Sequence, residues 1–335
     1  MKRIILAGIL VLLLCPMAHA GATEDNDLRI TIEPAHVWRT SATDHHLLIQ
    51  NDVNNFPSNT KEFSDINEPG QYGVQFDVVW QLSDAFALEF AGLWTDTVSS
   101  SGVFFDPSLS RPSSGTDAAY DQNPGNDFNT GNSSGLCALE YSFESQFMGA
   151  ELNVISNWGL DTSWFHYYLG LRYLHYYERV GTAAYDDEND YLRTDDDTDL
   201  VDIGTWNNLI GPQIGADLRV EPVEWLTIGA DAWIGYFLNS ATVSREFESL
   251  DLPAQRRDDV TCDSRGTLGM GLSPRASVQI LDNVALTLGG DLVWLGGVSL
   301  AGAYYSSIAD LDSTTLHADG SVLFLGAHGG IVITF

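Results

Sequence analysis

The side chains best suited to acid–base chemistry are histidines and aspartates in two distant segments. Asp44, His45 and His46 lie near the N-terminus, and His317 and Asp319 lie near the C-terminus. A positioned histidine and aspartate are what a hydrolase uses to activate water or a nucleophile. Nothing in the sequence ties the two segments together, and exposed histidines and aspartates are common in loops. We therefore predict that the chain is not an enzyme and keep peptide-bond hydrolysis as an alternative.

The densest acidic segment, residues 186–202, carries hard oxygen ligands of the kind that calcium takes. The four candidate ligands are Asp195, Asp196, Asp197 and Asp199. The segment lacks the spacing and the pivot glycine of an EF-hand. We therefore expect a solvated run of charge that binds calcium no tighter than about millimolar, and we predict no other cofactor.

The composition excludes several classes of protein. Fifteen Lys and Arg residues face 46 Asp and Glu residues, which gives a net charge of −31. Such a charge repels nucleic acid, so no nucleic-acid partner is expected. Hydrophobic residues make up 44% and aromatic residues 11% of the chain, too many for a disordered acidic segment. The chain can fold, and its charge must lie apart from its apolar surface.

The N-terminus has the pattern of a cleaved signal peptide. Lys2 and Arg3 precede an apolar run over 4–14 that is too short to span a bilayer, and residues 18–20 read Ala-His-Ala. We predict a signal peptide over 1–20 and one mature domain over 21–335, with 13 basic against 46 acidic residues. Lipid attachment at Cys15 is the alternative, although Leu14 occupies the position that needs a small residue.

The mature chain consists of segments with period-two alternation, separated in turn by tight turns and by long polar stretches. No apolar run reaches the roughly 20 residues of a transmembrane helix, and a closed barrel is the other structure that spans a membrane. A soluble β-sandwich with these faces in its core is the alternative. We predict an all-β, closed antiparallel transmembrane barrel of about ten strands, with twelve as the alternative. The ten strands are 28–38, 71–82, 85–95, 137–157, 163–176, 203–220, 225–238, 267–281, 284–297 and 320–335.

Short periplasmic turns and long outer loops should alternate along this barrel. The outer loops are expected near 40–70, 96–135, 177–202, 239–266 and 298–319, where most of the acidic residues lie. In 137–157 the apolar residues change parity halfway, and a β-bulge near Ser145 reconciles the two halves. Cys137 and Cys262 fall on strands that are not neighbours, so a disulfide between them, which stays an open alternative, has to cross the barrel mouth.

Aromatic residues gather near the predicted strand ends, as they do at the two interfaces of a membrane. One girdle is expected from Trp80, Phe86, Trp158, Trp164, Trp225 and Phe335, and the other from Trp38, Tyr72, Trp94, Trp206, Tyr236 and Trp294. The chain ends on an alternating strand whose residues Ile331, Ile333 and Phe335 resemble the signal that outer-membrane assembly machinery reads, and we predict that they serve as it. This last strand must pair with the first so that no strand edge is left open in lipid.

The polar faces of the strands should line the lumen as a paired network. Its charged members are Asp77, Glu89, Glu151, Arg172, Asp217, Arg219, Asp231, Arg275 and Asp291. Small barrels are filled by side chains, whereas open channels appear at around 16 strands. We therefore predict a structural surface barrel with a largely filled lumen. A narrow porin-like channel and an outer-membrane protease-like enzyme are the alternatives.

Three stretches resemble the planctomycete-type outer-membrane β-barrel protein family. They read W-N-N-L-I-G-P-Q-I-G-A at 206–216, L-G-L-R-Y-L-H-Y-Y-E-R at 169–179 and E-S-Q-F-M-G-A-E-L-N at 144–153. The resemblance covers roughly 136–240 by motif and the rest by architecture, and Ile210 stands where the family often has Tyr. It implies a barrel in the bacterial outer membrane without established catalytic residues. The expected partners are outer-membrane lipid and the barrel assembly machinery, and the sequence leaves the oligomeric state open.

Overall fold

The barrel wall consists of ten strands that follow one another in antiparallel pairs. The computed structural model describes residues 28–40, 46–51, 57–62, 70–83, 85–109, 136–156, 164–185, 198–249, 257–305 and 320–335. The wall strands are β1 (Leu28–Thr40), β4 (Gln71–Ser83), β5 (Phe86–Thr95), β7 (Leu136–Ser156), β8 (Phe165–Tyr185), β9 (Thr198–Val223), β10 (Leu226–Ser249), β11 (Arg257–Leu281), β12 (Val284–Val298) and β13 (Gly320–Thr334). Three further strands lie beyond the wall or extend it: β2 (His46–Asn51), β3 (Pro57–Glu62) and β6 (Val98–Leu109). One short helix, α3 (Ala301–Tyr305), follows β12.

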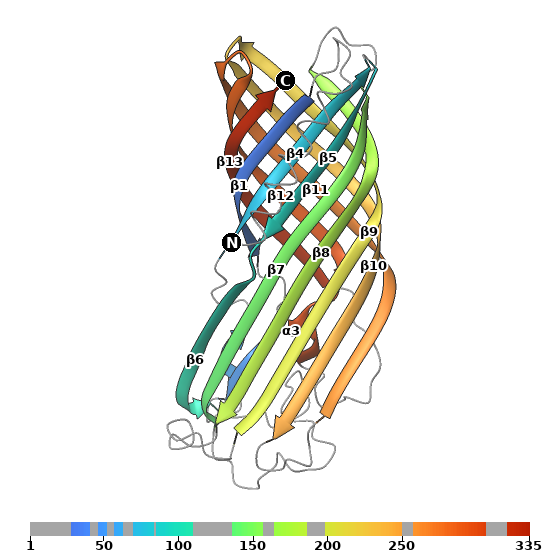
Figure 1. The fold of residues 1–335 in the computed structure, drawn as a ribbon. Helices are drawn as coiled ribbons and strands as arrows, with labels where there is room; N and C mark the ends of the chain where they lie inside the picture. Colours follow the sequence, from blue (N-terminus) through green and yellow to red (C-terminus); the bar gives the residue numbers. More distant parts are fainter. Residues whose placement is uncertain are drawn as a thin grey trace.

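The barrel is closed, because every wall strand pairs with two others. The order runs β5-β4-β1-β13-β12-β11-β10-β9-β8-β7, and β5 pairs with β7 to complete the ring (Figure 1). The first strand therefore pairs with the last, as the need to remove strand edges from lipid requires. The prediction of ten strands is confirmed, and the twelve-stranded alternative is wrong. No helix in the part of the chain that the structure describes is long and apolar enough to cross a membrane.

The wall is much taller on one side than on the other (Figure 1). Strands β7 to β11 have 21 to 26 residues each, whereas β1, β4, β5, β12 and β13 have 10 to 15. Much of what we predicted as loops over 177–202 and 239–266 is therefore strand. The sequence prediction ended these strands where the apolar face disappeared, but the extended backbone continues with its apolar residues on the opposite face.

The predicted β-bulge near Ser145 is wrong. Strand β7 pairs with β8 in one unbroken register from Ala138 to Ser156. The parity of its apolar residues changes because Phe143 faces the interior, whereas Leu152 faces outward. The extra residue lies on the neighbouring strand, where β5 passes into β6. The six residues from Leu93 to Val98 lie opposite the five from Gly149 to Ser145.

The tall strands carry two zones of opposite polarity. In the membrane zone, between the girdles, large apolar residues such as Leu169 and Leu288 point outward with 63% and 69% of their surface exposed. In the outer zone (98–109, 136–147, 176–185, 198–209, 239–249 and 257–267) apolar residues such as Tyr176 and Ile203 point inward and are fully buried. A barrel with an apolar exterior buries that surface only in lipid.

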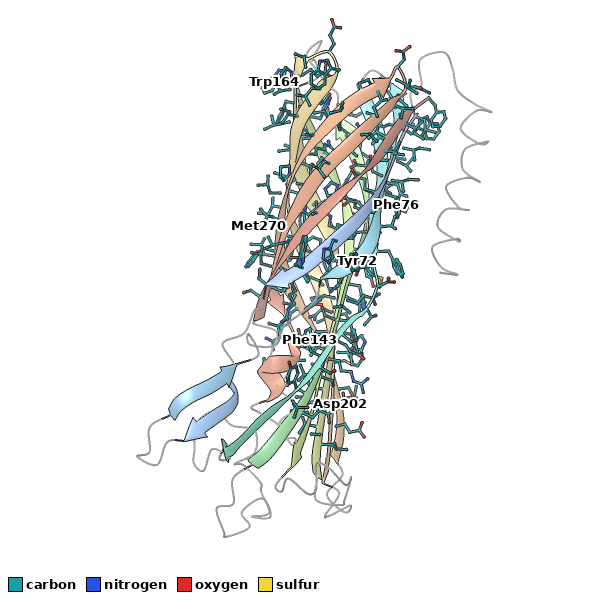
Figure 2. The ribbon with its side chains drawn as sticks, turned by 90° about the vertical axis from the view of Figure 1, so that its left-hand side faces the viewer. Tyr72, Phe76, Phe143, Trp164, Asp202 and Met270 are labelled. Atoms are coloured by element: carbon teal, nitrogen blue, oxygen red, sulfur yellow. The ribbon has the colours of Figure 1, made fainter. Side chains whose placement is uncertain are left out.

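Aromatic residues mark both borders of the membrane zone. The turn end carries exposed Trp80, Phe86, Trp164, Trp225 and Phe335, and the opposite border carries exposed Trp38, Tyr72 and Tyr236. Figure 2 labels one residue from each border, Trp164 and Tyr72. Trp233 differs, since it points into the lumen and is buried. The apolar band and its girdles identify a transmembrane β-barrel of the outer-membrane type. Residues 1–27, with the predicted signal peptide, and Trp158 lie outside the described residues.

Candidate functional site

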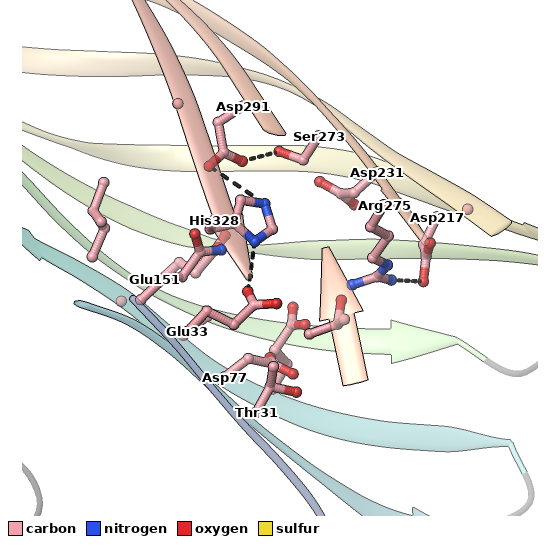
Figure 3. A pocket seen from close by; sticks show the side chains of 18 of the residues that line it. Thr31, Glu33, Asp77, Glu151, Asp217, Asp231, Ser273, Arg275, Asp291 and His328 are labelled. Atoms are coloured by element: carbon pink, nitrogen blue, oxygen red, sulfur yellow. Dashed lines mark hydrogen bonds and ion pairs between the residues drawn. The ribbon is translucent and has the colours of Figure 1, made fainter. Parts of the chain in front are cut away.

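The lumen of the membrane zone holds a polar cavity of about 460 Å³ (Figure 3). The structure places all nine charged residues of the predicted lumen network on its wall: Asp77, Glu89, Glu151, Arg172, Asp217, Arg219, Asp231, Arg275 and Asp291. The wall also includes Glu221 and Gln279, which are exposed at the turn end. The cavity therefore reaches the short-turn end of the barrel, where the first and last described residues, Leu28 and Phe335, are hydrogen-bonded to each other.

One half of the network is centred on Glu151 of β7. Arg172 of β8 donates to it through Nε at 3.2 Å, and the same guanidinium lies 3.8 Å from the Trp233 ring centroid. Asn153 donates to Glu151 at 3.1 Å and to Glu89 at 2.7 Å. Each carboxylate thus has a donor, and the charged groups hold one another instead of facing open water.

The other half is centred on Asp217 of β9. Arg219 and Arg275 both donate to the same oxygen of Asp217, each at 2.6 Å. Because Arg275 lies on β11, its bond joins β9 and β11 across β10. On the far wall Arg29 lies 3.4 Å from Asp77. These ion pairs join strands of the ring at several points along the cavity wall.

A third cluster joins the closing strands and was not identified from the sequence. His328 of β13 lies 2.8 Å from Glu33 of β1 and 3.7 Å from Asp291 of β12 (Figure 3). The Ser273 hydroxyl donates to Asp291 at 2.6 Å. The imidazole is thus held between two carboxylates, one from each of the strands that pair with β13. The sequence signal for this cluster is the alternation of β1, in which Ile32 faces lipid and the adjacent Glu33 faces the lumen.

A layer of apolar side chains, which we call the roof, lines this cavity toward the outer zone. Phe147 of β7 stacks on Phe324 of β13, with 4.1 Å between ring centroids, and Tyr176 meets the same ring edge-on at 5.2 Å. Because β7 and β8 are not neighbours of β13 in the ring, these contacts cross the lumen. Above them the buried ion pair of Arg39 with Glu178, at 3.3 Å, also crosses from β1 to β8.

The chain folds into the interior directly after β12. Gly297 adopts a φ of 82°, a left-handed conformation that favours glycine, and the following Ser299–Tyr305 segment enters the barrel. Ser299 and Tyr304 are buried and share a hydrogen bond of 2.9 Å between their hydroxyls. We refer to residues 299–305 as the inserted segment. Its Leu300 belongs to the same buried apolar cluster as Phe147 and Phe324 of the roof.

Buried polar side chains of the wall hold the inserted segment in place. The Asn207 side chain donates to the Ser299 carbonyl and accepts from the Ser299 N–H, both at 2.8 Å. Asn239 donates to Asn207 at 3.0 Å, and Thr267 donates to the Gly297 carbonyl at 3.0 Å. Backbone groups that enter the core are thereby satisfied, as their burial demands.

The candidate catalytic and metal residues are not brought together in the part of the chain that the structure describes. Asp44, His45, His317, Asp319, Asp195, Asp196 and Asp197 lie outside it, and of His46 and Asp199 only the strand backbone is described. Among the described residues no group of three or more His, Cys, Asp or Glu side chains is placed to hold a metal ion. Cys262 is free and exposed on β11, and the Cys137 side chain lies outside the described set.

The residues of the proposed assembly signal lie on the closing strand. Ile331 pairs with Ile32 and Ile333 with Ile30 of β1. Beyond the last strand residue, the Phe335 N–H donates to the Leu28 carbonyl at 2.9 Å. The hydrogen-bonded seam of the barrel therefore extends to the final residue of the chain.

No protein-family model matches the chain, and no curated protein matches it. Among solved structures, the outer membrane protease OmpT of Escherichia coli is 14% identical, with 93% of this chain and 98% of that chain covered and a TM-score of 0.46. Neisserial surface protein A is 8% identical, with 92% and 97% covered and a TM-score of 0.28. The toluene transporter TbuX of Ralstonia pickettii is 8% identical, with 93% and 90% covered and a TM-score of 0.32. At these scores none of the three decides an activity, and the fold rests on the strand pairing itself.

Proposed function

We propose that this chain is a structural surface barrel of the bacterial outer membrane, with a lumen that solutes do not cross. The observation that carries the proposal is the roof, where Phe147 and Phe324 stack across the lumen. On this proposal the stacked rings close the lumen to water and solutes. Leu300 of the inserted segment packs in the same buried apolar cluster as these two rings. The same proposal includes a cleaved signal peptide, delivery to the membrane by the barrel assembly machinery, and membership of the planctomycete-type family.

The charged lining supports the same function. A porin of 16 to 18 strands leaves an aqueous channel, whereas ten strands enclose a lumen that side chains can fill. Here the arginines are bound to carboxylates of the wall, as Arg172 is to Glu151 and Arg275 to Asp217. Such pairs hold the walls together and leave few groups free to bind a passing solute. We propose no enzymatic role, no cofactor and at most weak calcium binding for this chain.

A narrow channel is the second candidate, and the cavity favours it. The polar lumen opens toward the turn end. Among the described residues, the roof, the Arg39–Glu178 pair and the inserted segment lie between it and the outer side. A change that displaced them would leave a charged passage. The two functions therefore differ in one property, which is whether the cavity is reached from outside.

Thiol labelling tests this property directly. In a background with Cys137→Ser and Cys262→Ser, Ser273→Cys places one thiol on the cavity wall below the roof. Ser264→Cys places a matched thiol on the exposed outer surface of the same strand. A membrane-impermeant maleimide added to intact cells should label Ser264→Cys and spare Ser273→Cys, and opening the cells to the periplasm should allow both. Equal labelling of both variants on intact cells contradicts a closed lumen and favours the channel.

A further inference from the structure

An outward-facing cluster lies on β7, β8 and β9 at the border between the two zones. Its members are Glu144, Tyr173, His175, Tyr177, Arg179, Asp202, Trp206 and Asn208, and we call them the outer ledge. They face outward because the residues that alternate with them, such as Tyr176, Glu178 and Ile203, are buried inside the barrel. Asp202 projects from the outer surface of the tall strands in Figure 2.

Two aromatic rings form a platform at the centre of the ledge. The Trp206 indole lies against Gly204, where an added Cβ atom would come within 2.6 Å of the ring. The glycine thus lets the indole lie flat on the strand surface. The Tyr177 ring lies beside it, with 5.3 Å between ring centroids and 33° between the planes. The pair presents a broad aromatic surface to the outside.

Polar side chains surround this platform on both sides. Toward the outer end, Arg179 donates from Nε to both oxygens of Asp202 at 2.9 Å, and the Tyr177 hydroxyl donates to Glu144 at 3.3 Å. Toward the membrane, the Tyr173 hydroxyl donates to Asn208 at 2.8 Å, and His175 lies 3.0 Å from the same amide oxygen. The groups are fixed in place while the side chains of Arg179 and Asp202 stay 48% and 34% exposed.

The ledge continues the lipid-facing surface of the barrel. On the same strands, the residues below it are the exposed apolar side chains of Leu171 and Ile210. A surface at this height, directly above the apolar band, lies in the headgroup layer of the outer leaflet. Because the ledge is continuous with the lipid interface, its occupant is a lipid headgroup and not a soluble molecule.

The charge of the ledge selects among headgroups. Arg179 is neutralised by Asp202, and Glu144 adds a negative charge, which leaves the ledge at −1 with neutral histidine. The whole chain carries −31. A phosphate headgroup is repelled by such a surface. An uncharged sugar instead offers a C–H face to the two rings and hydroxyls to the carboxylates and the amide. We propose that the outer ledge binds the uncharged sugar headgroup of a glycolipid.

The opposite wall supplies a natural control. Trp294 of β12 also lies flat against a glycine, since an added Cβ at Gly296 would come within 2.5 Å of its ring. Its paired neighbours are Met270 and Leu323, which carry no hydrogen-bonding side chain. Trp294 therefore shares the aromatic feature of Trp206 and lacks its polar surroundings.

Native mass spectrometry of the refolded, delipidated barrel tests the proposal, which rests on the membrane position of the fold and not on the closed lumen. The probes are a monoglucosyl diacylglycerol, phosphatidylglycerol and phosphatidylethanolamine with matched chains. We expect the wild type to retain the glucosyl lipid about tenfold better than phosphatidylglycerol. Trp206→Ala or Tyr177→Ala should abolish this preference, and Trp294→Ala should preserve it. Heat-modifiable migration verifies that each variant is folded.

A charge change provides a second test that keeps both rings. Glu144→Gln combined with Asp202→Asn turns the ledge from −1 to +1, and we expect retention of phosphatidylglycerol to rise about tenfold. Free glucose at the concentration of the glucosyl lipid should not compete. The proposal is overturned if the wild type retains the lipids equally, if Trp294→Ala loses as much as Trp206→Ala, if the charge change leaves lipid choice unaltered, or if free glucose competes.

Discussion

The membrane zone and the outer zone share strands β7 to β11 but place their apolar side chains on opposite faces of these strands. In the membrane zone of β8, Leu169 points to lipid and Arg172 to the lumen, whereas farther along the same strand Tyr176 and Val180 point inward and Arg179 outward. The backbone and its period of two do not change between the zones. What changes is the surroundings of the outer face, which are lipid chains in the first zone and polar headgroups and water in the second. Alternation alone therefore fixes the strand, and the surroundings decide which face is apolar.

The largest effect is expected at the seam that closes the membrane zone. Truncation after Ile331 removes the last four residues, including the Phe335 N–H that donates to Leu28. Burial of one Phe side chain is worth only about 1.5–3 kcal/mol, but an open seam leaves backbone groups unpaired in lipid. We expect folded, heat-modifiable barrel to fall below detection in the outer-membrane fraction, and Phe335→Ala to lower it severely.

The control for this prediction is Phe86→Ala, since Phe86 is exposed in the same girdle to nearly the same extent, 50% against 52% for Phe335. This variant should assemble almost normally. Equal yields of the Phe86 and Phe335 variants would show that the terminal aromatic is an ordinary girdle residue.

A charge on the outer face should separate the two zones. Leu169→Arg places a cation on the lipid side of β8, and such substitutions cost about 2–4 kcal/mol near the bilayer centre. Ser142→Arg places the same cation on the exposed outer face of β7 in the outer zone, where about 0.5 kcal/mol or less is expected. Urea unfolding of both variants in lipid vesicles measures the difference. Similar costs would mean that the border between the zones is misplaced.

The interior of the outer zone should respond to the loss of one amide. Asn207→Leu leaves the N–H and carbonyl of Ser299 without their partner, and each buried unsatisfied group costs about 1–3 kcal/mol. Asn208→Leu changes the same residue type at the next position, on the outer face. We expect the first variant to expose the 297–305 region to protease and the second to leave it protected. Protection of both would indicate that the inserted segment is held by packing alone.

The smallest effect is expected from a surface ion pair of the outer zone. The hydrogen bond from Arg265 lowers the pKa of Asp263 below its ordinary value. A lowered carboxyl pKa adds stability above the ordinary pKa near 4, and this stability is lost as the pH falls through the lowered value. Asp263→Asn should therefore lower the unfolding temperature slightly at pH 7 and not at all at pH 2. A larger effect at low pH would contradict the sign.

The membrane zone was readable from the sequence because its alternation is local. Strand β12 was predicted as 284–297 and spans Val284–Val298, and the polar faces gave the charged residues that line the cavity. The sequence predicts a loop over the outer half of β8 because, beyond Tyr173, the apolar residues lie on the inward face of the strand and no longer on the outward face. Recognition of this switch requires knowledge of where the membrane ends, which period two does not contain.

The inserted segment could not be predicted from the sequence for a different reason. It has no periodicity, and it enters the barrel because Asn207, 92 residues earlier in the chain, binds the backbone of Ser299. The W-N-N motif did draw attention to this position but gave no sign that its two asparagines face opposite sides of the wall. The ion pair of Arg39 with Glu178 is equally non-local.

Single-channel recording on the refolded protein in planar bilayers tests the closed lumen most directly. The wild type should show no stable openings, because the stacked rings of Phe147 and Phe324 and the inserted segment close the path above the cavity. The matched variant Phe147→Ala with Phe324→Ala should show small openings under the same voltage. Stable, porin-sized conductance of the wild-type protein would contradict the closed structural barrel.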